Sequence, residues 1–184
     1  MFLKAFREKK ERKNSAHSLY ETIILQSRKP YFYQDYQVPD TVDGRFEVLI
    51  FHVFLVIERI KKEDKEKGYA LNQELFDLVF RDMDQNLRQI GIGDVTVPKH
   101  IKKMAKAFYG RSVAYLDGLR GLKDNNDPQK LYDAFDRNIF AKVKNVDKTS
   151  LEFFKDYLQM QKEYLEKKDY AEIEKGVISF KQYP

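Results

Sequence analysis

The feature that most constrains the fold is an apolar segment between residues 40 and 62, DTVDGRFEVLIFHVFLVIERIKK. From Val48 to Ile57 its only polar residue is His52. A helix that is apolar on every side is buried, either in a protein core or in a bilayer. A bilayer span needs roughly 20 predominantly apolar residues, and this run is shorter. The segment therefore predicts the buried central helix of an all-α domain.

Local chemistry indicates where this helix begins. Asp40 follows a proline and is expected to cap the free N–H groups of the first turn. Asp43 occupies the reciprocal capping position and faces the positive end of the helix dipole. Gly44 has no Cβ, which favours the close approach of another backbone segment. Arg45 lies beside both aspartates, and a structural role accounts for all four residues.

Composition favours one compact multi-helix domain. The chain has 184 residues, which is enough for a proper hydrophobic core. It is 42% hydrophobic, contains 14 Phe and 12 Tyr, and has few glycines and prolines, so neither disorder nor a strand-rich fold is expected. The absence of cysteine excludes disulfides, thiolate metal sites and a cysteine nucleophile.

Positive charge is concentrated at the beginning of the chain. Residues 1–13 contain six basic and two acidic side chains, a net charge of +4 out of +5 for the whole sequence. We expect a basic arm over 1–17, a helical domain over 18–141, and a C-terminal helix and tail over 142–184 that pack on the same domain. The arm is either an anionic-surface contact or a solvated tail. With no signal-peptide core, a cytoplasmic protein is expected, with peripheral contact at the inner membrane face as an option.

Hydrophobic periodicity predicts further helices over 18–28, 71–90 and 98–120, one beginning near 127, and a last one beginning near 149. Capping boxes are expected at Ser18 and at Thr149. Gly68 is expected to break the chain before helix 71–90, and Gly91 to end that helix. The aromatic residues between 31 and 36 are expected to cover the core rather than to stack on bases.

Two groups of charged residues stand out on these helices. Asp82 falls within the apolar stripe of helix 71–90, where a carboxylate needs a partner. We expect it to be buried and paired with Arg45 or Arg111, with Asp84 more exposed; the alternative is that Asp82 belongs to a site. A basic stripe on helix 98–120 is either a solvated face or a contact for lipid headgroups or RNA phosphates. Its residues are Lys99, Lys102, Lys103 and Lys106.

No catalytic, metal or cofactor motif is apparent. The three histidines occur in no Glu-x-x-His pair, and His52 is interpreted as a hydrogen-bonded core residue. A phosphate loop, a dinucleotide glycine fingerprint and a nucleophile elbow are all missing. The aspartates at 40/43 and 82/84 lack the DDxxD spacing of isoprenoid-diphosphate enzymes. We therefore predict no catalytic residue, no metal site and no cofactor.

Two sequence blocks resemble a known family, the ubiquinol–cytochrome c chaperones of alphaproteobacteria and mitochondria. FYQDYQVPDTVDGRFEVLIFHVFLVIERI, at 32–60, is similar to the family's VPDTxxGRFE…LHxFL pattern. LFDLVFRDMDQNLRQIGIGDVTVPKHIKKMAKAFYGR, at 75–111, is similar to its LFDxMFxDMDxxLREmGVGD…VKKMAxAFYGR pattern. The departures are mild and occur at Phe51, Val79 and Gln89.

The resemblance implies a non-catalytic assembly factor for newly made cytochrome b in the biogenesis of ubiquinol–cytochrome c reductase, the bc1 complex. Mitochondrial members of the family work with a small partner protein and near the ribosome; DNA is not an expected partner. The alternative is a peripheral membrane- or RNA/ribosome-binding helical module unrelated to respiration. The residues expected to form one partner-binding surface are Val38, Asp40, Asp43, Arg45, Gly91, Gly93, Asp94, Phe108, Tyr109 and Arg111.

Overall fold

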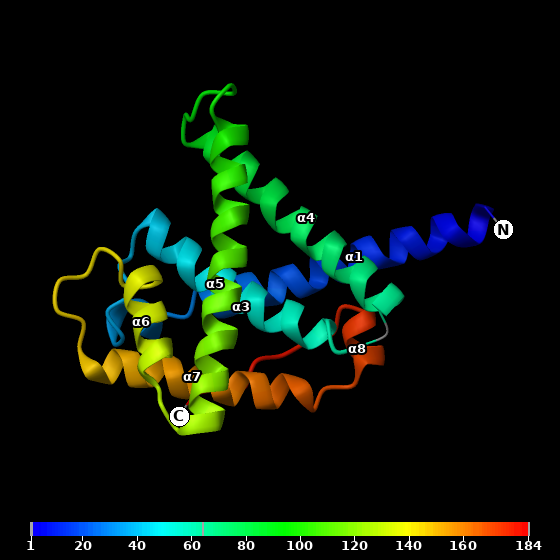
Figure 1. Ribbon diagram of the computed structural model, residues 1–184. Helices are drawn as coiled ribbons and strands as arrows, with labels where there is room; N and C mark the ends of the chain where they lie inside the picture. The colour runs from blue at the N-terminus through cyan, green and yellow to red at the C-terminus, as the bar shows by residue number, and fades with distance from the viewer. Residues whose placement is uncertain (1, 64, 184) are drawn as a thin grey trace.

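The computed structural model describes residues 2–63 and 65–183 and is built from helices joined by short connections (Figure 1). No strand occurs among these residues, so the predicted all-α class is confirmed. The helices are α1 (Phe2–Ser27), α2 (Tyr31–Gln34), α3 (Val42–Ile60), α4 (Lys65–Gln89), α5 (Val97–Asn125), α6 (Gln129–Asn138), α7 (Lys148–Glu166) and α8 (Tyr170–Glu174).

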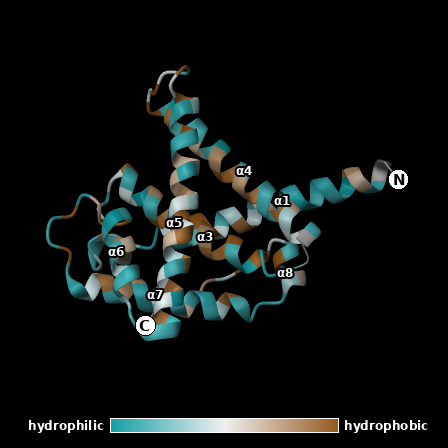
Figure 2. Cartoon of the chain, viewed as in Figure 1, coloured by the Kyte–Doolittle hydropathy of each residue, from teal (hydrophilic) through white to brown (hydrophobic). Residues whose placement is uncertain are grey.

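Helix α3 lies at the centre of the molecule, as its sequence predicts. Its residues from Glu47 to Ile57 are buried without interruption, and α1, α4, α5 and α7 all pack against it. Figure 2 shows this helix as a hydrophobic segment surrounded by helices with hydrophilic outer faces. Because neighbours cover it on all sides, no polar face was needed, which explains why its sequence shows none.

The cap of α3 differs by one residue from the prediction. Thr41, not Asp40, is the N-cap, and its Oγ1 accepts a hydrogen bond from the Gly44 N–H at 3.2 Å. Asp40 instead accepts a 2.6 Å bond from Arg45. The expected close approach at Gly44 is confirmed, because a Cβ at this position would lie 2.0 Å from the carbonyl oxygen of Pro39.

Helix α1 is one continuous helix, so the predicted start at Ser18 is wrong. The exposed first half of α1 has no apolar stripe, but i,i+4 ion pairs support it: Arg7 Nε lies 2.8 Å from a Glu11 oxygen. The basic arm is therefore a helical extension that projects from the body (Figure 1). Burial begins at Ser15 and Ala16, so the expected boundary between 17 and 18 falls inside the packed part of α1.

The two glycines that frame α4 behave differently. Gly68 does not end a helix: it lies inside α4 and packs closely against the end of α3, where a Cβ at this position would lie 2.9 Å from the carbonyl oxygen of Ile60. Gly91 ends α4 as predicted, with a φ of 89°. Its N–H donates to the Arg88 carbonyl, and the Ile92 N–H to the Leu87 carbonyl, both at 3.0 Å, which is the Schellman arrangement.

The C-terminal region packs on the same core. Asp147, not Thr149, is the N-cap of α7, because the backbone already turns helical at residue 148. After α8 the tail runs back along α7, where Gln161 exchanges hydrogen bonds with the backbone of Lys181 at 2.7 and 2.9 Å. The Phe180 ring lies 5.1 Å from that of His52. This return fixes the tail against α3 and α7.

Aromatic residues of the segment before α3 complete the core, as expected. Phe32 in α2 is fully buried, and its ring contacts Phe153, Phe154 and Tyr157 of α7 at 5.4–6.0 Å between centroids. Tyr36 stacks on Phe153 at 3.5 Å. These rings join the connection between α1 and α3 to α7, so no free aromatic platform is left there.

Candidate functional site

A groove lies between α1, the beginning of α3 and the hairpin formed by α4 and α5. It consists of two adjoining cavities of about 430 and 410 Å³. Both are lined by the apolar residues Val42, Phe46, Leu87 and Met104. We call this surface the hairpin groove. Apolar recesses of this size are typical of ligand- and peptide-binding sites.

Basic side chains dominate the rim of the hairpin groove. The basic lining residues are Arg28, Arg45, His100, Lys103, Arg111 and Lys142. The acidic residues of the lining are also partnered: Asp43 with Lys142, Glu47 with Arg111, and Asp82 with Tyr20 and Asn86. Three of the basic residues are neutralised by carboxylates, since Arg45 pairs with Asp40 in addition to the two pairs above, so the excess positive charge of the rim is modest. A groove with an apolar interior and such a rim suits a segment that is itself apolar and carries little positive charge.

The pair of Glu47 and Arg111 fixes α5 to α3 beneath this groove. Arg111 Nε donates to Glu47 at 2.6 Å, and a second guanidinium N–H donates to the other carboxylate oxygen. The Glu47 side chain is 9% exposed. Burial raises the pKa of its carboxyl above the ordinary value, and Arg111 opposes that rise. The bidentate geometry makes this a structural ion pair rather than a free acid.

Asp82 has a different partner from the one expected. It is half-buried and accepts hydrogen bonds from the Tyr20 hydroxyl at 2.8 Å and from Asn86 at 3.1 Å. The predicted pairing with Arg45 or Arg111 is wrong, because those arginines bind Asp40 and Glu47. The expected contrast with Asp84 is wrong too, since Asp84 is also half-buried and pairs with Arg88 at 2.5 Å.

His52 is fully buried in the core. Its Nδ1 lies 2.7 Å from the Val48 carbonyl oxygen, which can only accept, so Nδ1 carries the proton. Nε2 then accepts from the Tyr157 hydroxyl at 2.9 Å. Burial lowers the His52 pKa to about 4. The ring is therefore neutral at physiological pH and ties α3 to α7.

The residues expected to form one partner surface are divided by the structure. Asp43, Arg45 and Arg111 line the hairpin groove. Val38 is buried in the core, and Phe108 is buried beside Tyr109, where it lines a separate cavity. Asp40 is bonded to Arg45 at the edge of the groove. The other residues lie elsewhere: Gly91, Gly93 and Asp94 in the turn at the end of the hairpin, and Tyr109 in the same separate cavity as Phe108.

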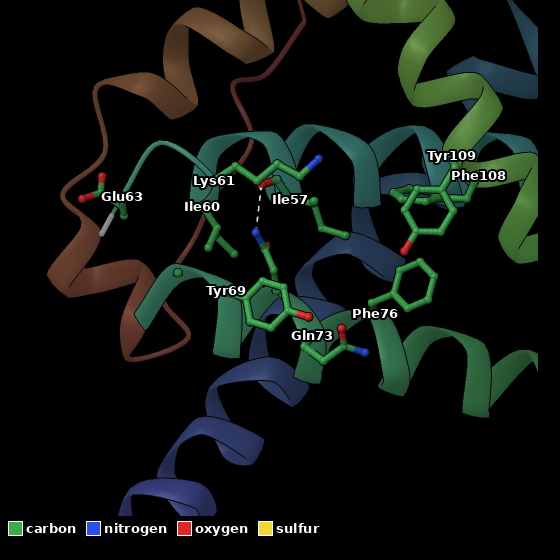
Figure 3. A pocket seen from close by; sticks show the side chains of 11 residues that line it. Ile57, Ile60, Lys61, Glu63, Tyr69, Gln73, Phe76, Phe108 and Tyr109 are labelled. Carbon is green, nitrogen blue, oxygen red and sulfur yellow. Dashed lines mark hydrogen bonds between the residues drawn. The ribbon is translucent and has the colours of Figure 1, made fainter. Parts of the chain in front are cut away.

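That separate cavity, of about 460 Å³, lies between the end of α3, the first half of α4 and the middle of α5. Figure 3 shows side chains of all three helices around it: Ile57 and Ile60 of α3, Tyr69 and Phe76 of α4, and Tyr109 of α5. Tyr69 and Tyr109 are exposed. We call it the tyrosine cavity. The hairpin of α4 and α5 thus has an apolar recess near each end of α3.

These features define an all-α protein with recesses suited to binding a polypeptide segment. None of the helices within the described ranges combines the length and hydrophobicity that a membrane span requires. In the same part of the chain, no group of His, Asp and Glu residues is arranged to hold a metal ion. The arrangement can bind by shape and charge.

The sequence model of the ubiquinol-cytochrome C chaperone family matches residues 34–180, and the chain belongs to this family. The resemblance seen in the two sequence blocks is thereby confirmed. The crystal structure of the Cbp3 homolog from Brucella abortus has 36% sequence identity and a TM-score of 0.81, and the match covers 99% of this chain and 97% of that one.

Curated relatives are more distant in sequence. Ubiquinol-cytochrome c reductase complex assembly factor 1 of Mus musculus is 25% identical over 154 residues, which are 84% of this chain and 50% of the relative. The mitochondrial protein CBP3 of Saccharomyces cerevisiae is 26% identical over 164 residues, which are 88% of this chain and 47% of the relative. The chain thus spans about half the length of these two relatives.

Proposed function

We propose that this protein is an assembly factor of ubiquinol–cytochrome c reductase and that it binds newly made cytochrome b without catalysing a reaction. The observation that carries the proposal is the family match over 34–180, together with the fold shared with the Brucella abortus Cbp3 homolog. The Mus musculus relative, whose name describes assembly of this reductase, supports the same role. The alternative of a module unrelated to respiration has no comparable support.

The hairpin groove is the proposed client site. A newly made membrane protein exposes apolar helices before its partners cover them, and an apolar recess can shield such a segment from water. Val42 is 68% exposed at the edge of the groove, which makes it available to a client. The tyrosine cavity, on the other side of the contact between α4 and α5, provides a second surface that a small partner protein could occupy.

A non-enzymatic role is consistent with the chemistry of the groove. Catalytic groups are usually held with perturbed pKa values and free to reach a substrate. Here the carboxylate with the raised pKa, Glu47, is already engaged by both arms of Arg111. Asp82 is likewise occupied by Tyr20 and Asn86.

Anionic surfaces are proposed as additional contacts. The first half of α1 and the lysines of α5 are exposed and basic, and phosphate-rich surfaces such as the ribosome or an anionic membrane attract such charges. We propose that the protein works in the cytoplasm with peripheral contact at the inner face of the cell membrane.

Affinity purification from detergent-solubilised membranes tests the client site. We expect cytochrome b to copurify with the tagged protein, and the Val42→Glu variant to reduce the recovered amount several-fold. Glutamate in the first turn of α3 favours the helix dipole, so folding should be preserved. Val177→Glu is the matched control, because Val177 is a similarly exposed valine in the tail, 58% accessible.

The wild-type sample tests the identity of the client, and the Val42→Glu sample tests the location of the client site. If cytochrome b is missing from the wild-type sample, the proposed client is wrong. If the Val42→Glu variant recovers as much cytochrome b as the wild type, the hairpin groove is not the client site.

A further inference from the structure

The turn between α4 and α5 exposes aliphatic side chains at the far end of a projecting hairpin (Figure 1). Val95 is 85% exposed and Ile90 is 62% exposed. Figure 2 shows hydrophobic residues in this turn, beyond the hydrophilic surface of the two helices. Scattered exposed aliphatic residues are common on proteins, so these two carry a proposal only together with their surroundings.

Those surroundings are strongly cationic. Residues 88–106 contain five basic side chains and one carboxylate, a net charge of +4. The single acid, Asp94, is engaged by Arg88 at 2.5 Å. Four exposed lysines follow the turn along α5, one of which (Lys103) also lines the hairpin groove, and none forms an ion pair with a residue that the structure describes. They are Lys99, Lys102, Lys103 and Lys106.

Unpaired lysines next to exposed aliphatic residues match the chemistry of an anionic lipid surface. Lysine ammonium groups interact with headgroup phosphates while their methylene chains lie along apolar material. Aliphatic side chains gain when they leave water for the boundary between headgroups and acyl chains. Single-stranded RNA would also attract the lysines, but it binds through aromatic stacking, which Val95 and Ile90 cannot provide. The aliphatic tip therefore favours lipid over RNA.

We propose that the α4–α5 hairpin is a membrane-contact element that inserts Val95 into the headgroup region of an anionic bilayer, with the four lysines bound to lipid phosphates. Ile90 connects this element to the hairpin groove, because it is exposed beside the turn and also lines the groove. A hairpin bound in this way holds one end of the groove at the bilayer. The last point rests on the proposed function, since it places the client site where a membrane protein emerges.

The chain contains no tryptophan, so a single introduced tryptophan reports its own surroundings. For the Val95→Trp variant we expect a blue shift of emission on vesicles of phosphatidylcholine and phosphatidylglycerol in equal parts. Lipids brominated on their acyl chains should quench that emission. Vesicles of phosphatidylcholine alone should cause neither effect. Leu25→Trp is the control, because Leu25 is 69% exposed and belongs to α1 rather than to the hairpin, and its emission should stay that of a solvated indole.

Two further variants separate the contributions of charge and of the aliphatic tip. Replacing the four lysines with glutamate should weaken vesicle binding at least tenfold. The far-ultraviolet circular dichroism should stay unchanged, because all four side chains are exposed. Val95→Asp, with the lysines intact, should weaken vesicle binding but not binding to an oligouridylate.

A Val95→Trp emission that does not shift on anionic vesicles overturns the proposal. Lysine-dependent binding to oligouridylate without vesicle binding also overturns it and assigns the surface to RNA. Because the pure protein is tested without client, either failure is distinct from failure of the proposed assembly function.

Discussion

The Arg111→Met variant is expected to lose about 3–5 kcal/mol of unfolding free energy. Glu47 would remain in a site where its side chain is 9% exposed, without the guanidinium that engages both of its oxygens. Methionine retains much of the apolar stem, so the loss reports the uncompensated carboxylate rather than lost packing. Urea denaturation at neutral pH measures it.

The pH dependence of the same variant identifies the cause. Without Arg111, burial raises the pKa of Glu47 further above its unfolded value. The folded state then binds a proton more tightly than the unfolded state, so stability falls as pH rises through this range and recovers as pH is lowered. The double variant Glu47→Gln/Arg111→Met should recover part of the loss at neutral pH. A loss below about 1 kcal/mol, as for exposed ion pairs, would contradict a structural role for this pair.

The Phe54→Ala variant is expected to cost about 3–5 kcal/mol as well. Phe54 is 2% exposed, and its ring lies 5.4 Å from that of Tyr115. It also borders a cavity of about 100 Å³ between α3, α5 and α7, so the removed ring would enlarge an existing space. Val113→Ala, at a site 64% exposed on α5, should change stability by less than about 0.5 kcal/mol. A thermal transition of Phe54→Ala that matches the wild type would place this side chain outside the core.

Elements with a strong local signal could be predicted from the sequence. The continuous apolar run of α3 and the three- and four-residue spacing in α4 and α5 indicated their type and approximate extent. Gly91 at the end of α4 was predictable because a left-handed residue there needs no Cβ. Such signals depend on a residue and its close neighbours in the chain.

Features that depend on competition between local interactions could not be predicted to the residue. Asp40 and Thr41 are both suitable N-cap residues. Thr41 is the N-cap in the structure, and the Asp40 carboxylate pairs with Arg45 instead. The first half of α1 lacks an apolar stripe, and hydrophobic periodicity therefore misses a helix supported by ion pairs. Asp82 accepts a hydrogen bond from Tyr20, which is 62 positions away in the sequence. Helical periodicity contains no information about that contact.

Of the residues that line the hairpin groove, only charged ones were predicted from the sequence. Asp43, Arg45 and Arg111 belong to the two family-like blocks and line the hairpin groove. The apolar lining was missed, because Phe46, Leu87 and Met104 read as core-facing positions of amphipathic helices. Leu87 lies at the end of α4 and Met104 near the beginning of α5, where the hairpin extends beyond the core. A periodic pattern does not show where a neighbouring helix stops covering an apolar face.

The level of assembled bc1 complex in a strain without the gene tests the central claim most directly. Native gel electrophoresis and the absorbance of haem b measure it, with transcript levels as a reference. We expect assembled complex to fall while transcripts stay unchanged. Wild-type protein and Val177→Glu should restore the complex in proportion to their amount, and Val42→Glu should not. Full levels of assembled complex in the deletion strain would contradict the account.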